Sequence, residues 1–158
     1  MKKEIASFMV CLLLVLVFKS CTTDDANPEE VKVTSADMEA IKAAVKIGEW
    51  RISYYFDTDN DQTADYADFV FTFKADGSLG ATDGNTAISG AWSVSSSDNS
   101  NDDSNDDSVD FNITFSSPAK FLELSEDWEI IEYSGNSLGL KDVSGGNGGT
   151  DLLTFEKN

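Results

Sequence analysis

The hydrophobic residues of this chain follow two different periods, and the first is helical. From Thr34 to Ile47, apolar residues recur every three or four positions, as on one face of an α-helix. Thr34 and Asp37 have the spacing of a capping box, and Gly48 is typical of the residue that follows a helix. The residues of the apolar face are Met38, Ile41, Ala44 and Val45. The pattern predicts one short amphipathic helix that packs on the domain behind it.

After Gly48 the period becomes two. Apolar and polar residues alternate in short segments, and Asp-Gly turn signals at Asp76-Gly77 and Asp83-Gly84 separate the first of them. The apolar positions of these segments are Trp50, Ile52, Tyr54 and Phe56; Phe69, Phe71 and Phe73; those of a short strand around Leu79 to Thr82; Ile88, Trp92 and Val94; Val109, Phe111, Ile113 and Phe115; Trp128, Ile130 and Ile131; Leu138 and Leu140; and Leu152, Leu153 and Phe155. We expect an all-β domain of about eight antiparallel strands, a barrel or a sandwich, with one face of the sheet in the core.

Two segments interrupt this series of strands. Residues 95–108 contain only Ser, Asp and Asn, and residues 145–149 contain only Gly and Asn. Neither segment has apolar side chains whose burial would offset the conformational entropy lost on ordering. We therefore predict two loops at these positions.

The first 20 residues have the pattern of an export signal. Lys2 and Lys3 precede an apolar run, residues 5–18, that is shorter than the about 20 residues a membrane-spanning helix needs. The following residues, Phe18-Lys19-Ser20-Cys21, resemble the lipobox of bacterial lipoproteins. This resemblance implies that residues 1–20 are a signal peptide and that Cys21 carries the lipid, palmitate included. Cys11 would leave with the signal, so the mature chain would have neither a free thiol nor a disulfide.

The residues after Cys21 are polar and acidic. Thr22-Thr23-Asp24-Asp25 resembles the acidic export signal of Bacteroidota surface lipoproteins. The resemblance implies a chain that is anchored in the outer membrane by its N-terminal acyl chains and exposed on the cell surface. We expect residues 21–33 to form a lipidated acidic tether and residues 34–158 to form the folded domain.

Four short motifs, in order, resemble those of small bacterial lipocalin-like lipoprotein domains. They are Gly48-Glu49-Trp50, Phe71-Thr72-Phe73 with Asp76-Gly77, Gly90-Ala91-Trp92, and the apolar strand at Leu152 to Phe155. The resemblance implies an up-and-down, calycin-type barrel of eight strands after one short helix, with an interior that binds a small apolar ligand. The alternative is a barrel filled by its eight phenylalanines, with Trp50 as a plug at one end, which acts as an interaction or adhesion module.

Composition excludes several functions. The chain has 11 basic and 29 acidic residues, a net charge of -18 and no histidine. Removal of residues 1–20 takes away three lysines and one glutamate, which leaves 8 basic and 28 acidic residues. Without histidine there is no Ser-His-Asp or Cys-His catalysis, and so acidic a surface repels nucleic acid. No pair of carboxylates is marked as catalytic, so we expect a monomeric binding or structural protein without enzymatic activity.

An acidic segment between the first two strands has the ligand spacing of an EF-hand calcium loop. Gln62 stands where such loops have a turn-forming Gly, and the flanking segments read as strands instead of helices. The alternative is a solvated acidic loop, and no other cofactor is expected. The candidate calcium ligands are Asp57, Asp59, Asp61, Thr63, Asp65 and Asp68.

Overall fold

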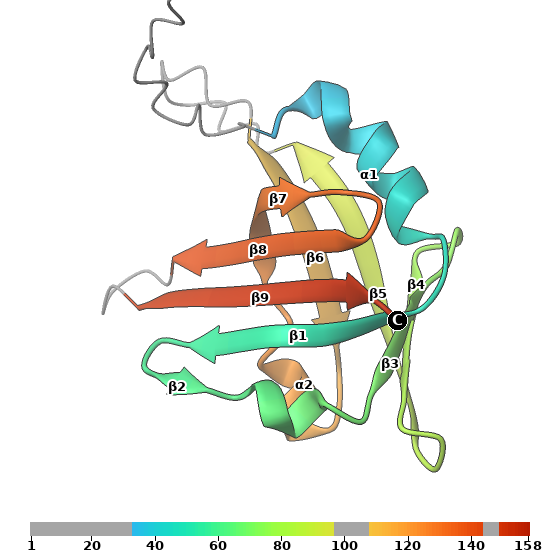
Figure 1. Ribbon diagram of the computed structural model, residues 1–158, viewed down its shortest axis with the longest axis vertical. Coiled ribbons are helices and arrows are strands. Elements are labelled where there is room, and N and C mark those ends of the chain that lie inside the picture. The colour runs from blue at the N-terminus through green and yellow to red at the C-terminus, as the bar shows by residue number, and fades with distance from the viewer. Residues whose placement is uncertain (1–32, 97–107, 144–148) are drawn as a thin grey trace, which may run out of the picture. The chain divides into compact units, whose positions relative to one another are not determined.

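The computed structural model describes residues 33–96, 108–143 and 149–158, which form a closed antiparallel barrel of eight strands after one short N-terminal helix (Figure 1). The fold class predicted from the hydrophobic pattern is confirmed. The strands are β1 (Trp50–Asp57), β3 (Val70–Phe73), β4 (Ser78–Thr82), β5 (Ala87–Ser96), β6 (Val109–Phe115), β7 (Asp127–Tyr133), β8 (Ser137–Val143) and β9 (Thr150–Lys157). The remaining elements are η1 (Ser35–Asp37), α1 (Met38–Val45), β2 (Asn60–Asp61), η2 (Thr63–Tyr66) and α2 (Ala119–Leu122).

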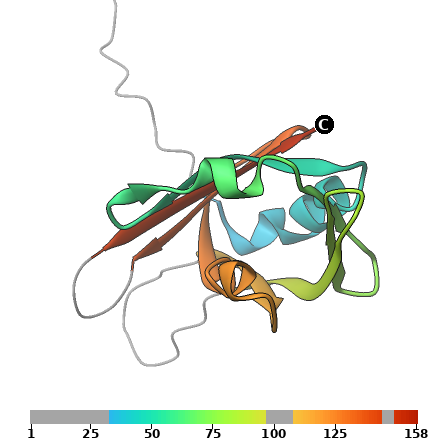
Figure 2. The same cartoon turned by 90° about the horizontal axis from the view of Figure 1, so that it is seen from below.

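The barrel closes where the first strand meets the last. β1 pairs with β9 from Trp50↔Lys157 to Phe56↔Leu152, and each further strand pairs with its neighbour in sequence. The pairing of β1 with β3 is confined to Trp50↔Phe71, because β1 continues away from β3 into a hairpin with the two-residue strand β2. Figure 2, seen from below, shows the strands around the barrel, with α1 visible between them.

A β-bulge in β1 changes which of its residues face the core. The register of β1 against β9 shifts between Ile52 and Tyr54. Strict alternation would bury Tyr54, but Tyr54 is 38% exposed and Tyr55 is buried instead. The prediction from alternation is wrong at this point, because a bulge adds one residue to a strand and turns the following side chains over.

The N-terminal helix begins as the sequence predicts. Thr34 and Asp37 form the capping box: the backbone N–H of Thr34 donates to Asp37 Oδ2 over 3.0 Å. Ile41 and Val45 of α1 are buried. Val33, assigned to the tether from the sequence, is also buried in the core, so the folded domain starts before Thr34.

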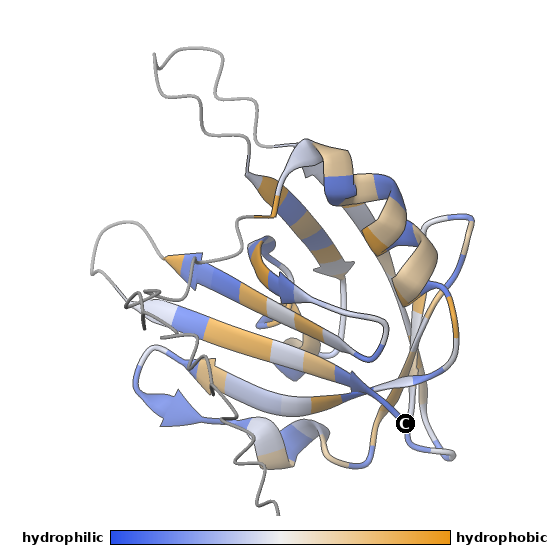
Figure 3. Ribbon diagram, turned by 45° about the horizontal axis from the view of Figure 1, so that its top comes forward, coloured by the Kyte–Doolittle hydropathy of each residue, from blue (hydrophilic) through white to orange (hydrophobic). Residues whose placement is uncertain are grey.

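The core is apolar throughout, and no buried polar or charged residue is found in the described part of the chain. Figure 3 shows the alternation of hydrophobic and hydrophilic residues along the strands. In Figure 1, α1 lies at the top of the domain and α2 at the bottom. Ile41 of α1 and Phe121 of α2 are both fully buried, so each helix contributes to the same core. Among the helices that the structure describes, none has the length and apolar character needed to cross a membrane.

Candidate functional site

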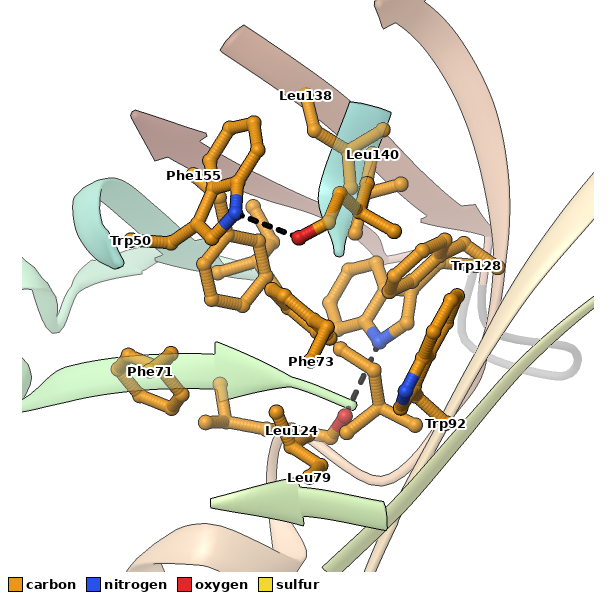
Figure 4. Close-up of a cluster of buried hydrophobic side chains, with 14 of the residues drawn as sticks. Trp50, Phe71, Phe73, Leu79, Trp92, Leu124, Trp128, Leu138, Leu140 and Phe155 are labelled. Carbon is orange, nitrogen blue, oxygen red and sulfur yellow. Dashed lines mark hydrogen bonds between the residues drawn. The ribbon is translucent and has the colours of Figure 1, made fainter. Parts of the chain in front are cut away.

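Aromatic rings and leucine side chains pack together in the barrel interior, where the resemblance to lipocalin-like domains implies a ligand (Figure 4). Phe73 lies at the centre of this aromatic cluster, with its ring centroid 6.4 Å from that of Trp50 and 5.5 Å from that of Phe155. Phe71 continues the contact from Phe155 at 5.3 Å to Phe121 at 6.2 Å. Centroid distances of 4.5–7 Å are those of rings in direct contact. A chain of touching rings therefore runs from the end of the barrel under α1 to the end over α2.

Two tryptophans connect this cluster to the helices that close the barrel. Trp50 donates from Nε1 to the carbonyl oxygen of Val45, the last residue of α1, over 2.8 Å. Trp128 donates from Nε1 to the carbonyl oxygen of Leu124, just after α2, over 3.1 Å. Figure 4 shows both hydrogen bonds as dashed lines. Trp50 is fully buried, and Lys157 Nζ lies 5.1 Å from its ring centroid.

The end of the barrel at α2 is closed by a second set of contacts, which involves η2. The hydroxyl of Tyr66 donates to the carbonyl oxygen of Lys120. The Lys120 ammonium group donates in return to the carbonyl oxygen of Asp65 over 2.7 Å, and it lies 4.6 Å from the ring centroid of Phe69. These reciprocal contacts hold η2 and α2 together.

Two buried phenols take part in this closure. Burial raises the pKa of Tyr55 and of Tyr66, and neighbouring carboxylates raise both further. The Tyr55 hydroxyl donates to the carbonyl oxygen of Glu123 over 3.0 Å. Both phenols therefore stay protonated hydrogen-bond donors at neutral pH, which is a structural role.

The candidate calcium ligands lie along β1, β2 and η2, and several of them bond to their own loop. Asp57 Oδ2 accepts from Gln62 Nε2 over 2.8 Å, and Asp61 Oδ1 accepts from the backbone N–H of Thr63 over 3.0 Å. Thr63 Oγ1 accepts from the backbone N–H of Tyr55 over 2.9 Å. Hydrogen bonds from Thr63 lower the pKa of Asp61. These side chains thus hold the loop to itself and to the backbone of β1.

The remaining candidate ligands are not gathered around a common point. Asp59 lies in the turn between β1 and β2, Asp65 lies within η2, and Asp68 follows η2. Within residues 33–96, 108–143 and 149–158, no group of three or more acidic or cysteine side chains is arranged to hold a metal ion. Calcium binding stays a prediction, which only a measurement with the metal decides.

Glu126 is the acidic residue whose surroundings are most crowded by like charge. Partial burial raises the pKa of its carboxyl group, and Asp142, Asp151 and Asp127 raise it further. A raised carboxyl pKa is common at active sites, but structural charge networks produce it too. The raised pKa of Glu126 thus reflects burial first and repulsion among carboxylates second.

The outside of the barrel carries open hollows. One of about 370 Å³ lies over Val33, Ile131 and Tyr133. A second of about 500 Å³ lies between the start of β5 and the segment that leads from β6 to α2. A third of about 230 Å³ lies beside Lys42, Lys46 and Trp92. No motif in the sequence marks these hollows, because each is made by segments that are distant along the chain.

Several sequence predictions fall outside the described residues. They include the signal peptide, the lipid-bearing Cys21, nearly all of the tether, and most of the two loops predicted at residues 95–108 and 145–149. The structure therefore places no atom of the predicted anchor, and these assignments rest on the sequence.

Comparison with known proteins gives one distant likeness. No protein-family model matches the chain, and no curated protein sequence matches it. The chain is similar to the crystal structure of a DUF4847 family protein from Bacteroides vulgatus ATCC 8482, with 19% sequence identity and a TM-score of 0.45. The likeness covers 75% of this chain and 97% of that chain. At this level it assigns neither a family nor a function, so the function has to be argued from the residues of the chain itself.

Proposed function

We propose that this chain is a lipid-anchored lipoprotein of the cell envelope whose barrel is a filled interaction module that recognises its partner with its outer surface. The observation that carries the choice of a filled barrel is the aromatic cluster. Trp50, Phe73, Phe155, Phe71 and Phe121 touch one after another across the interior. An eight-stranded barrel has room either for its own side chains or for one small ligand. Rings that touch from end to end favour the former.

The anchor is supported by the order of the N-terminal segments. A positive start, a short apolar run, a cysteine after a small residue, and an acidic stretch follow one another in residues 1–25. One acyl chain holds a protein on a membrane only marginally, whereas two give stable attachment. Lipidation at Cys21 would therefore keep the domain at the outer membrane, and the acidic segment after it supports display on the cell surface.

The filled interior is tested by native mass spectrometry of the full chain released from detergent. The proposal predicts one mass, that of the lipidated polypeptide alone. A stoichiometric additional mass of a few hundred daltons, lost on collisional activation, would show an apolar ligand held within the barrel and would overturn this part of the proposal.

The anchor is tested by cysteine substitution in cells that are fed a labelled fatty acid. Cys21→Ala should abolish the label and release the protein from the membrane fraction. Cys11→Ala is the matched control, because it also removes a thiol but lies in the segment expected to be cleaved off, and it should leave both label and fractionation unchanged. Equal membrane attachment of the two variants would refute lipidation at Cys21.

A further inference from the structure

The pairing between strands β5 and β6 stops before the first residues of β5 are reached. β5 pairs with β4 over Ala87 to Ala91, but it pairs with β6 only from Gly90 onward. Residues 87–89 therefore have a strand on one side and, among the described residues, none on the other. A short stretch of sheet edge is left open where the chain leaves β6 for α2. Such an edge presents backbone donors and acceptors to whatever lies beside it.

Gly90 fixes the point at which the two strands separate. A Cβ atom at this position would lie 2.5 Å from the carbonyl oxygen of Thr114 and 2.6 Å from the ring of Phe115. The two strands thus approach each other so closely at Gly90 that a side chain there would require them to shift. Beyond it, the segment 116–118 turns away from β5 and leaves the hollow of about 500 Å³. This volume lies within the range of about 300–1,000 Å³ that is typical of small-molecule sites.

The lining of this hollow is uncharged and combines hydroxyl groups with apolar surface. Residues 86–89 and 116–118 form it, and none of them is ionisable, although 25% of the whole chain is charged. It contains four hydroxyl groups, which belong to Thr86, Ser89, Ser116 and Ser117. Ile88, only 9% exposed, and Pro118 add apolar surface beside the hydroxyls. Ser89, Ser116 and Ser117 are all exposed, so their hydroxyls are open to solvent or to a ligand.

The charged residues nearest in sequence to this lining are engaged elsewhere. The Asp83 carboxylate accepts from the backbone N–H groups of Asn85 and Thr86, over 2.9 Å and 2.6 Å. Lys120 Nζ donates to the carbonyl oxygen of Asp65 over 2.7 Å. A cation in the hollow would find no carboxylate in its lining. An anion would meet both a lining without lysine or arginine and a chain with a net charge of -18.

We infer that this hollow, here called the serine hollow, is a binding site for a neutral saccharide, which is the ligand class of the outer-surface recognition proposed above. A sugar offers hydroxyls that donate and accept at once, so they match serine hydroxyls as well as the N–H donors and C=O acceptors of a sheet edge. Its apolar ring faces match the surface of Ile88 and Pro118. An extended peptide is a poorer match, because the open edge covers only residues 87–89, and strand addition draws its affinity from a row of main-chain hydrogen bonds.

Isothermal titration calorimetry of the full chain in detergent tests this inference. The probes are neutral oligosaccharides of glucose, xylose, mannose and galactose, with an oligogalacturonate as the anionic comparison. We expect saturable binding of at least one neutral probe and none of oligogalacturonate. Removal of two hydroxyls by Ser89→Ala with Ser116→Ala should weaken this binding about thirtyfold, since each hydrogen bond contributes about 1 kcal/mol and about 1.4 kcal/mol is a factor of ten.

The matched control is Ser53→Ala with Ser93→Ala, which removes two exposed strand hydroxyls outside the hollow and should leave the affinity unchanged. Three outcomes overturn the inference: no heat of binding with any neutral probe, binding of the anionic probe alone, or equal affinity of both double variants. None of them bears on the anchor or on the filled interior, whose tests use mass spectrometry and fatty-acid labelling, so failure of the serine hollow leaves those two results standing.

Discussion

The two ends of the barrel are closed by the same kind of contact, which is built from different kinds of sequence. At one end Trp50 donates its indole N–H to the last carbonyl of α1, and at the other end Trp128 donates to a carbonyl just after α2. The last carbonyls of a helix lack partners within the helix, and the Trp50 indole satisfies one of them, at Val45. The helix at the first end is predicted by a local sequence pattern, namely the capping box and the periodicity of α1. No local sequence pattern predicts the helix at the second end.

The difference teaches where local sequence stops being informative. The closure at α2 depends on bonds between distant positions: Tyr55 with Glu123, 68 residues apart, and Lys120 with Asp65, 55 residues apart. A helix of four residues has no stability of its own, because nucleation is costly and few bonds follow it. α2 therefore exists through tertiary contact, whereas α1 has a start signal of its own.

The largest expected effect comes from the residue that connects both ends. Phe73→Ala removes a ring in contact with Trp50, Trp92 and Phe155, and it should lower the free energy of unfolding by about 3–5 kcal/mol. Tyr54→Ala on the outside of β1 is the control and should cost less than ~1 kcal/mol. Urea denaturation followed by circular dichroism measures both. Similar losses for the two would mean that the interior is not the tightly packed part of the domain.

The contribution of each indole hydrogen bond to the closure of its end is tested by removing each indole N–H in turn. Trp50→Phe removes the indole donor from the Val45 carbonyl and should lower the free energy of unfolding by about 1–3 kcal/mol. Trp128→Phe removes the indole donor from the Leu124 carbonyl, which still accepts from the backbone N–H of Glu126 over 3.2 Å, so its loss should be smaller, about 0.5–1.5 kcal/mol. The measurement is again urea denaturation. If one variant is as stable as the wild type, the end of the barrel that it closes is not sealed by this hydrogen bond, and the comparison between the ends fails.

The two lysines at the ends of the barrel should contribute different amounts to the free energy of unfolding. Lys120→Met loses a hydrogen bond to Asp65 and the contact with the Phe69 ring, so it should cost about 1–2 kcal/mol. Lys157→Met loses its position over the single ring of Trp50 and should cost about 0.5 kcal/mol. Thermal unfolding of both variants gives the order, and a larger loss for Lys157→Met would contradict it.

A smaller effect, one that depends on pH, is expected at the α1 end. Hydrogen bonds from Thr34 and from the Tyr133 hydroxyl lower the pKa of Asp37 in the folded state. The stabilisation is complete above the unfolded-state pKa of about 3.9 and is lost as the pH falls through the lower folded-state value. Asp37→Asn should therefore lower the melting temperature at pH 7, and the difference from the wild type should shrink below about pH 4. A difference that is constant from pH 7 to pH 3 would exclude this linkage.

The smallest expected effect is that of calcium. Asp61 and Thr63 already bond within the loop between β1 and β3, so we expect equal melting temperatures in millimolar calcium and in chelator. A metal that binds the folded state must raise the melting temperature. A rise that Asp57→Asn with Asp61→Asn abolishes would restore the predicted calcium site.

The sequence was sufficient for the strands, the α1 helix and most of the core. Val109, Phe111, Ile113 and Phe115 are all buried as their alternation predicts, because β6 is regular. It was insufficient at Tyr54, because the bulge in β1 depends on the register against β9. The serine hollow could not be predicted from the sequence for a related reason. Its two walls, residues 86–89 and 116–118, meet only through the folding of the barrel.

The central claim, a barrel filled by its own rings between two closed ends, is tested most directly by crystals of the domain under xenon pressure. An apolar cavity of about 150 Å³ stays dry and takes up xenon. The account predicts no xenon atom among Trp50, Phe73 and Phe155. A well-occupied xenon site between these three rings would reveal an interior cavity and contradict the account.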